Sequence, residues 1–316
     1  MDTKNCHLSA LWKPEVIQAI CRALRAGPEE ISHVSALKQG MTNRSFLFSC
    51  RGERYIIRVP GEGTGRLISR RQEAEVYRTV QGRDLCEDVL FLDPDTGYKL
   101  TRFISGARTC GPLAPSDTAA CMAKLRAFHR LGLRVDHEFN LFDRIDFYES
   151  LWEGRPSAYP DYRETKAAVL ALKPFIDANA GERALTHIDA VPDNFLFFPD
   201  GQGGQALRLI DWEYAAMQDP HVDVAMFCIY AMYNREQADR LIGQYFTEGC
   251  PVKTRIKIYC YIAVCGLLWS NWCEYKRSLG VEFGAYCLEQ YRYARDYCAI
   301  VRQELEKLGE ELPCTQ

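Results

Sequence analysis

A short segment from His187 to Asn194, with the sequence HIDAVPDN, gathers side chains that can carry out chemistry. Asp189 offers a carboxylate that can accept the proton of a hydroxyl group and orient that group for attack. Asn194 lies five residues later and offers a neutral amide oxygen, which can bind Mg²⁺ without adding charge. Asp211 ends the apolar run LRLID, and its carboxylate is a second candidate metal ligand. These placements predict a site that activates a hydroxyl group beside a metal ion.

Aspartate and asparagine are also common in turns, where their side chains bond to nearby backbone groups. We favour this structural interpretation for Asp193, which follows a proline, and we expect His187 to brace the loop through hydrogen bonds. For Asp189, Asn194 and Asp211 the chemical interpretation is stronger, because three independent placements agree with one another and with the strands around them.

Groups that hold a phosphate donor are expected in the first hundred residues. The segment LKQGMTNRSF is a strand, a turn and a strand, in which Gly40, Thr42 and Asn43 can bring backbone N–H groups to phosphate oxygens. A hairpin turn that binds no phosphate would have the same sequence pattern. On the next strand, YIIRVP, Arg58 can clamp phosphates with its planar guanidinium. Glu73, in the following helix, is its predicted partner, the alternative being a solvated glutamate.

The elements that position these residues fall into two parts. Residues 34–59 alternate as strands around a glycine-containing turn, and 89–104 read as another hairpin. Between them, Ser69 can cap a helix. After residue 105 helices dominate, interrupted by short strands at 195–198 and 207–210. The sequence therefore predicts an α+β protein, with a small antiparallel-sheet lobe with one helix over 1–105 and a larger, mainly helical lobe over 106–316.

Composition limits the class of protein and of partner. The formal charge of −3, from 39 basic and 42 acidic residues, offers no basic surface for nucleic acid or an anionic membrane. Fourteen cysteines without a CxxC pair read as reduced thiols, and the first residues show no secretory signal. The most apolar run, 256–270, contains Lys257 and is too short to span a bilayer. We expect a cytoplasmic protein without membrane insertion that binds a small molecule.

These pieces together resemble the choline/ethanolamine kinase family, of the bacterial choline kinase type, within the aminoglycoside phosphotransferase superfamily. The resemblance rests on GMTNRSFLF, YIIRVPGEGTGRLISRRQE, HIDAVPDNFLFF and LIDWEYAAMQDPHVDVA, and it spans roughly residues 34–300. The spacing of the third segment matches the catalytic loop of kinases, H-x-D-x-x-x-x-N. The resemblance implies a two-lobed, protein-kinase-like fold.

The resemblance also implies roles for individual residues. Asp189 would be the catalytic base, and Asn194 and Asp211 would hold Mg²⁺. Arg58 with Glu73 would position the phosphates of ATP. The segment that would receive adenine through its backbone comprises Arg102, Phe103 and Ile104. In addition, Asp223 matches an aspartate that supports the catalytic loop, so we expect it to be structural.

A trimethylammonium group binds to aromatic faces with help from a carboxylate. Trp269 and Trp272 lie one helical turn apart in LLWSNW, and we expect a cage formed by these two residues with Tyr230 and Tyr286. A buried aromatic stripe has the same helical spacing and is the alternative. The sequence also departs from the family at two positions. Gly266 stands where the family has its second cage tryptophan, and Tyr230 stands where the family has an acidic residue.

The leading hypothesis is an ATP- and Mg²⁺-dependent phosphotransferase that phosphorylates the hydroxyl of a small amino alcohol, choline first. Ethanolamine, an aminoglycoside or another small hydroxyl compound is an alternative acceptor. An aminoglycoside site should be lined by several acidic residues, whereas the C-terminal region is aromatic with mixed charge. A catalytically inactive binding protein of the same fold is the alternative from another class, and it should have lost one of the base or metal groups.

Overall fold

The computed structural model describes residues 12–37, 43–61 and 63–310. The chain divides into two compact units. The first comprises Met1–Arg108 and Leu196–Tyr214, and the second comprises Thr109–Phe195 and Ala215–Gln316. The lobe boundary near residue 105 remains a prediction from the sequence. Each unit is described by itself below.

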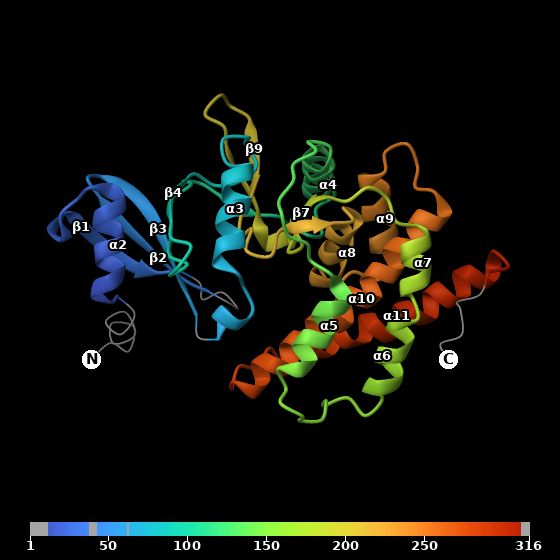
Figure 1. Cartoon of the computed structure of the whole chain (residues 1–316). Coiled ribbons are helices and arrows are strands. Elements are labelled where there is room, and N and C mark those ends of the chain that lie inside the picture. Colours follow the sequence, from blue (N-terminus) through green and yellow to red (C-terminus); the bar gives the residue numbers. More distant parts are fainter. Residues whose placement is uncertain (1–11, 38–42, 62, 311–316) are drawn as a thin grey trace. The chain divides into compact units, whose positions relative to one another are not determined.

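The first unit is built on a five-stranded antiparallel sheet, four of whose strands are labelled in Figure 1. The strand order is β1-β2-β3-β5-β4. Its strands are β1 (Ile31–Ala36), β2 (Asn43–Cys50), β3 (Glu53–Pro60), β4 (Val89–Leu92) and β5 (Lys99–Arg102). Arg51 and Gly52 join β2 to β3, and both have a positive φ, of 53° and 80°. A two-residue hairpin turn of this conformation matches the twist of the strands it joins.

Two helices accompany this sheet. Helix α2 (Pro14–Leu24) buries Val16 and Ile20 in one hydrophobic cluster with Phe46 and Phe48 of β2, and Figure 1 shows it against the sheet. Helix α3 (Arg70–Val80) begins after Ser69, whose hydroxyl accepts a hydrogen bond from the amide of Gln72 at 3.4 Å. The predicted helix cap is therefore confirmed.

A three-stranded sheet has the order β6-β8-β9, with β6 (Arg108–Thr109), β8 (Phe195–Pro199) and β9 (Gln205–Leu209). The hairpin of β8 and β9 is bound to the loop that precedes β4. The amide of Leu209 donates to the carbonyl of Leu85 at 2.8 Å, and Arg208 pairs with Asp84 and Asp88. These contacts explain why residues 196–214 belong to the first unit although they come late in the chain.

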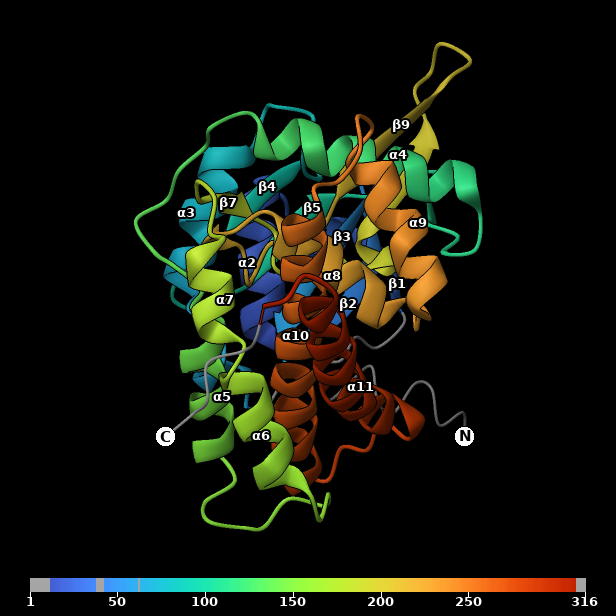
Figure 2. The same ribbon diagram turned by 90° about the vertical axis from the view of Figure 1, so that its right-hand side faces the viewer.

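The second unit is mainly helical. Its helices are α4 (Pro115–His129), α5 (Leu141–Ser150), α6 (Tyr162–Leu170), α7 (Lys173–Ala178), α8 (His221–Tyr230), α9 (Arg235–Tyr245), α10 (Val252–Ser278) and α11 (Ala285–Lys307). The strands β7 (Ala184–Thr186) and β10 (Ala216–Gln218) pair antiparallel. In Figure 2 the long helices α10 and α11, in orange and red, run side by side. The predicted α+β class is confirmed.

Helix α10 forms the core of the second unit. It extends beyond the apolar run of the sequence, and by length and composition alone it could cross a membrane. Its most apolar stretch is entirely buried within the protein, so its apolar side chains are covered by neighbouring elements. At Gly266 a Cβ atom would lie 2.7 Å from the carbonyl oxygen of Gln290 on α11. The absence of a side chain at Gly266 thus allows α10 and α11 to approach closely.

Candidate active site

The loop that carries Asp189 follows β7 and is held from α8. Both carboxylate oxygens of Asp223 accept backbone hydrogen bonds, from the amide of His187 at 2.9 Å and from the amide of Ile188 at 2.8 Å. The ring of His129 lies 2.9 Å from the same carboxylate. Asp223 is fully buried, so these bonds are shielded from water. The prediction that Asp223 supports the loop is confirmed.

The backbone of this loop is strained at Ile188. Its φ of 68° places a β-branched residue in the left-handed region, which costs on the order of 1–3 kcal/mol. Asp223 offsets this cost by bonding the amide of Ile188 itself. The strained residue immediately precedes Asp189, so the conformation that Asp223 maintains also sets the position of that carboxylate.

Asp189 and Asn194 are neighbours in this loop. The Nδ2 group of Asn194 donates to the backbone oxygen of Asp189 at 2.9 Å and to its carboxylate oxygen Oδ2 at 3.1 Å. The amide nitrogen of Asn194 thereby orients the carboxylate. Its other amide atom, Oδ1, accepts no hydrogen bond from the residues that the structure describes. The pair therefore combines an oriented carboxylate with an oxygen available to a ligand.

In the first unit, Arg58 on β3 makes a two-bond ion pair with Glu73 on α3. The distances are 2.5 Å from Nη1 to Oε1 and 2.8 Å from Nη2 to Oε2. Nη2 also donates to the carbonyl of Gly97 at 3.1 Å. The predicted pairing of Arg58 with Glu73 is confirmed, and both side chains are buried.

Two residues of this cluster, Arg70 and Glu213, were not identified from the sequence. Arg70 bonds with Nη1 to Glu73 and to Glu213, both at 2.9 Å. The side chain of Asn43 donates to Glu213 at 2.8 Å and accepts from Arg70 at 3.2 Å. The sequence contained a signal for each. Arg70 lies three residues before Glu73 on one helix, a spacing at which side chains contact each other. Glu213 lies only two residues after the predicted metal ligand Asp211.

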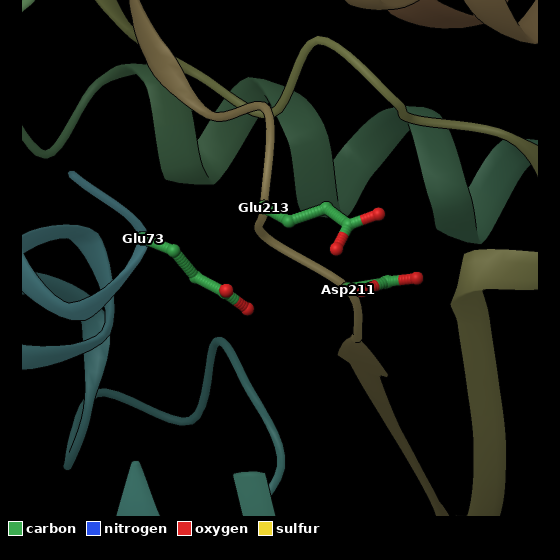
Figure 3. Close-up of side chains that lie close together, drawn as sticks. All are labelled: Glu73, Asp211 and Glu213. Atoms are coloured by element: carbon green, nitrogen blue, oxygen red, sulfur yellow. The ribbon is translucent and has the colours of Figure 1, made fainter. Parts of the chain in front are cut away.

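Three acidic side chains lie close together in this cluster (Figure 3). Glu73, Asp211 and Glu213 can each present one oxygen within 4.8 Å of the others. Asp211 is the most accessible, with 31% of its side chain exposed, and it lies 3.4 Å from Arg58. Partial loss of hydration inside the protein and the negative charge of Glu213 raise the pKa of Asp211 to about 7. Carboxylate oxygens are the ligands that Mg²⁺ prefers, so the donor set fits this ion.

The other predicted nucleotide-binding residues are placed as follows. The amides of Arg102 and Phe103 already donate, to the carbonyls of Asp88 at 3.1 Å and Arg54 at 3.0 Å. The backbone of this segment is predicted to receive adenine, and of its three amides that of Ile104 is therefore the best placed to donate. Gly40 and Thr42 lie outside the described residues.

The predicted cage residues belong to the second unit and differ in burial. Trp269 and Trp272 on α10 are only 5% and 1% exposed, with ring centroids 5.7 Å apart and edge-to-face. The indole of Trp269 donates to the sulfur of Met226 at 3.0 Å. Tyr230 and Tyr286 are half-buried, with centroids 5.9 Å apart. The two tyrosines thus offer more surface to a ligand than the two tryptophans.

Comparison with known proteins places this geometry in a family. Residues 33–259 match the model of the phosphotransferase enzyme family. The chain is 29% identical over 288 residues to protein LicA of Haemophilus influenzae, an alignment that covers 87% of this chain and 79% of that protein. The family match spans most of the chain and includes both Asp189 and Asp211.

Solved structures agree with this assignment. Choline kinase LicA from Streptococcus pneumoniae is 28% identical, with a TM-score of 0.78 over 90% of this chain and 98% of that one. A structure of LicA in complex with AMP gives a TM-score of 0.77 at 28% identity, covering 91% and 98%. A choline/ethanolamine kinase family protein from Mesorhizobium loti, at 25% identity, gives 0.70 over 92% and 95%. The chain therefore belongs to the phosphotransferase enzyme family, shares the protein-kinase-like fold of LicA choline kinase, and is a small-molecule kinase.

Proposed function

We propose that this kinase transfers the γ-phosphoryl group of ATP to the hydroxyl of a small amino alcohol, choline first. The observation that carries the proposal is the arrangement of Asp189 and Asn194 in a loop held by Asp223. The similarity to choline kinase LicA and to a choline/ethanolamine kinase family protein supports the choice of acceptor.

Asp189 is the proposed catalytic base. Its carboxylate would accept a hydrogen bond from the acceptor hydroxyl and take the proton as the oxygen attacks phosphorus. Asn194 keeps the carboxylate oriented through its Nδ2 group, so that little reorganisation is needed during the reaction. The strained but firmly held backbone at Ile188 serves the same end.

Asn194 and Asp211 remain the proposed Mg²⁺ ligands, and Glu213 joins them as a candidate. Mg²⁺, when bound, would neutralise charge on the phosphoryl oxygens. Arg58 would add positive charge for the ATP phosphates, and Glu73 fixes its orientation. Adenine would bond to the backbone of the segment that ends at Ile104. The structure of LicA with AMP supports nucleotide binding in this family.

The acceptor site is proposed within the second unit. Tyr230 and Tyr286 would offer aromatic faces to the ammonium group, and Trp269 and Trp272 remain proposed cage residues. An ammonium group needs few polar partners, whereas an aminoglycoside needs many, so the aromatic surroundings favour a small cationic alcohol. Ethanolamine and other small alcohols stay alternative acceptors.

We also propose that the protein acts in the cytoplasm. The cysteines in the part of the chain that the structure describes are thiols rather than disulfides, and most of them are buried. Thiols remain reduced in that compartment, which supports the proposal.

A panel of acceptors tests the function. Purified protein with ATP and Mg²⁺ is offered choline, ethanolamine, an aminoglycoside and neutral alcohols, and ADP release is measured. We expect the highest kcat/KM with choline. Asp189→Asn should lower kcat by about 10²–10⁴-fold, the usual contribution of a general base. Asp177→Asn, an exposed aspartate of the second unit, is the matched control. Activity of Asp189→Asn within a few-fold of wild type, or no turnover of any acceptor, would overturn the proposal.

A further inference from the structure

One contact of the catalytic loop has no part in the mechanism above. Asp193 immediately precedes Asn194 in the short 3₁₀ helix η3 (Pro192–Asn194). The hydroxyl of Tyr230, at the end of α8, donates to the carboxylate oxygen Oδ2 of Asp193 at 3.2 Å. Asp193 is exposed and Tyr230 is half-buried. A phenol thus fixes a carboxylate that is accessible to a ligand.

The surroundings of this contact are aromatic and negatively charged. Tyr286, in the first turn of α11, packs edge-to-face against Tyr230 at a centroid distance of 5.9 Å. Burial raises the pKa of both tyrosines, and the negative charge of Asp189 raises both further. The phenols therefore stay neutral, and both lie within the electrostatic reach of Asp189. The carboxylates that act on Tyr230 are those of Asp193 and Asp189.

We propose that Asp193 is a specificity-determining residue that recognises the positive charge of the acceptor. Its carboxylate, held by Tyr230, would attract the cationic end of the amino alcohol while Asp189 holds the hydroxyl at the other end. This assignment rests on the proposed function. It adds a role to the turn position that the sequence indicates for Asp193, which lies in η3.

The chemistry of the acceptor defines what Asp193 can contribute. A quaternary ammonium group has no N–H to donate, so its attraction to a carboxylate is coulombic, supplemented by contact with aromatic faces. Tyr230 and Tyr286 supply such faces without adding charge. Asp193 should therefore discriminate between a charged and an uncharged acceptor of the same shape.

Choline and 3,3-dimethyl-1-butanol provide this comparison, because the alcohol replaces the charged nitrogen by carbon. We expect wild-type protein to prefer choline in kcat/KM, and Asp193→Asn to reduce that preference about tenfold through a higher KM for choline. Asp193→Glu should restore most of the preference, since it restores the charge. Tyr230→Phe, which keeps the ring but releases Asp193, should reduce the preference less than Asp193→Asn. Asp177→Asn should retain it.

The outcomes separate this assignment from the proposed function. If wild-type protein phosphorylates choline but Asp193→Asn keeps the full preference over the neutral alcohol, the role of Asp193 is refuted and the function stands. Equal turnover of both alcohols by wild-type protein also refutes it. If neither alcohol nor any other acceptor is phosphorylated, the function fails, and the assignment with it. Turnover of the neutral alcohol by Asp193→Asn reports that the variant is folded.

Discussion

Arg58 and Glu73 are joined by two hydrogen bonds, of 2.5 and 2.8 Å, in the interior of the first unit. Burial alone would raise the pKa of Glu73, but the charge and hydrogen bonds of Arg58 lower it to about 2. The pair is therefore charged throughout the neutral range. A guanidinium presents both N–H groups in a fixed plane, which explains why arginine suits this position.

Arg58→Lys should lower kcat/KM for ATP by at least about tenfold. Lysine keeps the charge but offers a single ammonium group, which cannot bond both oxygens of Glu73 and the carbonyl of Gly97 in this geometry. Steady-state kinetics with varied ATP at saturating acceptor measures the change. Arg71→Lys, an exposed neighbour on α3, is the control and should have no effect. Unchanged ATP kinetics in Arg58→Lys would contradict a role for the pair.

Lys257→Met should destabilise the protein by about 3–5 kcal/mol. Lys257 is buried on α10 and bonds to Asp219 at 2.7 Å and to the carbonyl of Asn179 at 2.9 Å. Its removal leaves a buried carboxylate without its cation. Urea unfolding measures the difference, and Lys253→Met, which breaks an exposed pair on the same helix, should cost about 0–1 kcal/mol. Similar losses of unfolding free energy in both variants would show that burial of the ion pair does not determine its contribution to stability.

The stability difference between wild type and Lys257→Met should depend on pH. Burial raises the pKa of Asp219, but His221 and Lys257 outweigh it, so the net shift is downward. A lowered pKa contributes stability that is present above the unfolded value and is lost as the pH falls through the folded value. The difference between wild type and Lys257→Met should therefore begin to shrink below about pH 4, the ordinary pKa of an unfolded aspartate, and should continue to shrink as the pH falls through the lower folded value. Urea unfolding repeated at pH 7 and below pH 4 tests this, and a constant difference would argue against it.

Gly266→Ala should destabilise the protein by about 1–3 kcal/mol, the usual cost of overpacking a core. The added methyl group would lie 2.7 Å from the carbonyl of Gln290 and 2.9 Å from the amide of Ala294, both backbone atoms of α11. Gly243→Ala on α9 is the matched control, because nothing lies within 4 Å of its Cβ position. Thermal unfolding should show Gly243→Ala to be neutral or stabilising. Equal behaviour of the two variants would contradict the close helix packing.

Cys287 should react with iodoacetamide at neutral pH. A hydrogen bond from the Cys273 thiol lowers the pKa of Cys287 to about 7, although burial opposes the shift. The reactive thiolate accumulates above that pH, so the alkylation rate should rise with a midpoint near pH 7. In Cys273→Ala the midpoint should move upward, toward the ordinary thiol value. Cys250, whose pKa burial raises to about 11, is an internal control in peptide mass spectra. Identical profiles for the two cysteines would refute the interpretation.

Local signals in the sequence were sufficient for much of the fold. The turn at Arg51 and Gly52 and the cap at Ser69 depend on neighbouring residues only, and both are found as expected. The pairing of Arg58 with Glu73 could also be predicted, because strand and helix follow each other directly. Asp189 and Asn194 lie in one loop, so their spacing alone places them together.

Contacts between residues far apart in the sequence could not be predicted from such local signals. Arg70 and Glu213 are separated by 143 residues, and neither residue type indicates the other. The hydrogen bond between Leu85 and Leu209 has the same character. Helical spacing could not decide the surroundings of Trp269 either, because a cage and a buried stripe share one periodicity. Only packing distinguishes the two.

The placement of residues 196–214 in the first unit bears on how the protein is synthesised. The first part of that unit ends at Arg108 and the second at Tyr214, so at about 5–20 residues per second the ribosome needs about 5–20 s to bridge them. During that interval the loop that precedes β4 lacks its hydrogen bond from Leu209 of β9, and the buried side chains of Asn43 and Arg70 lack the carboxylate of Glu213. A fragment that stops near residue 105 would keep this incomplete state permanently. Its separate expression would require the 196–214 hairpin to be supplied in trans or fused to it.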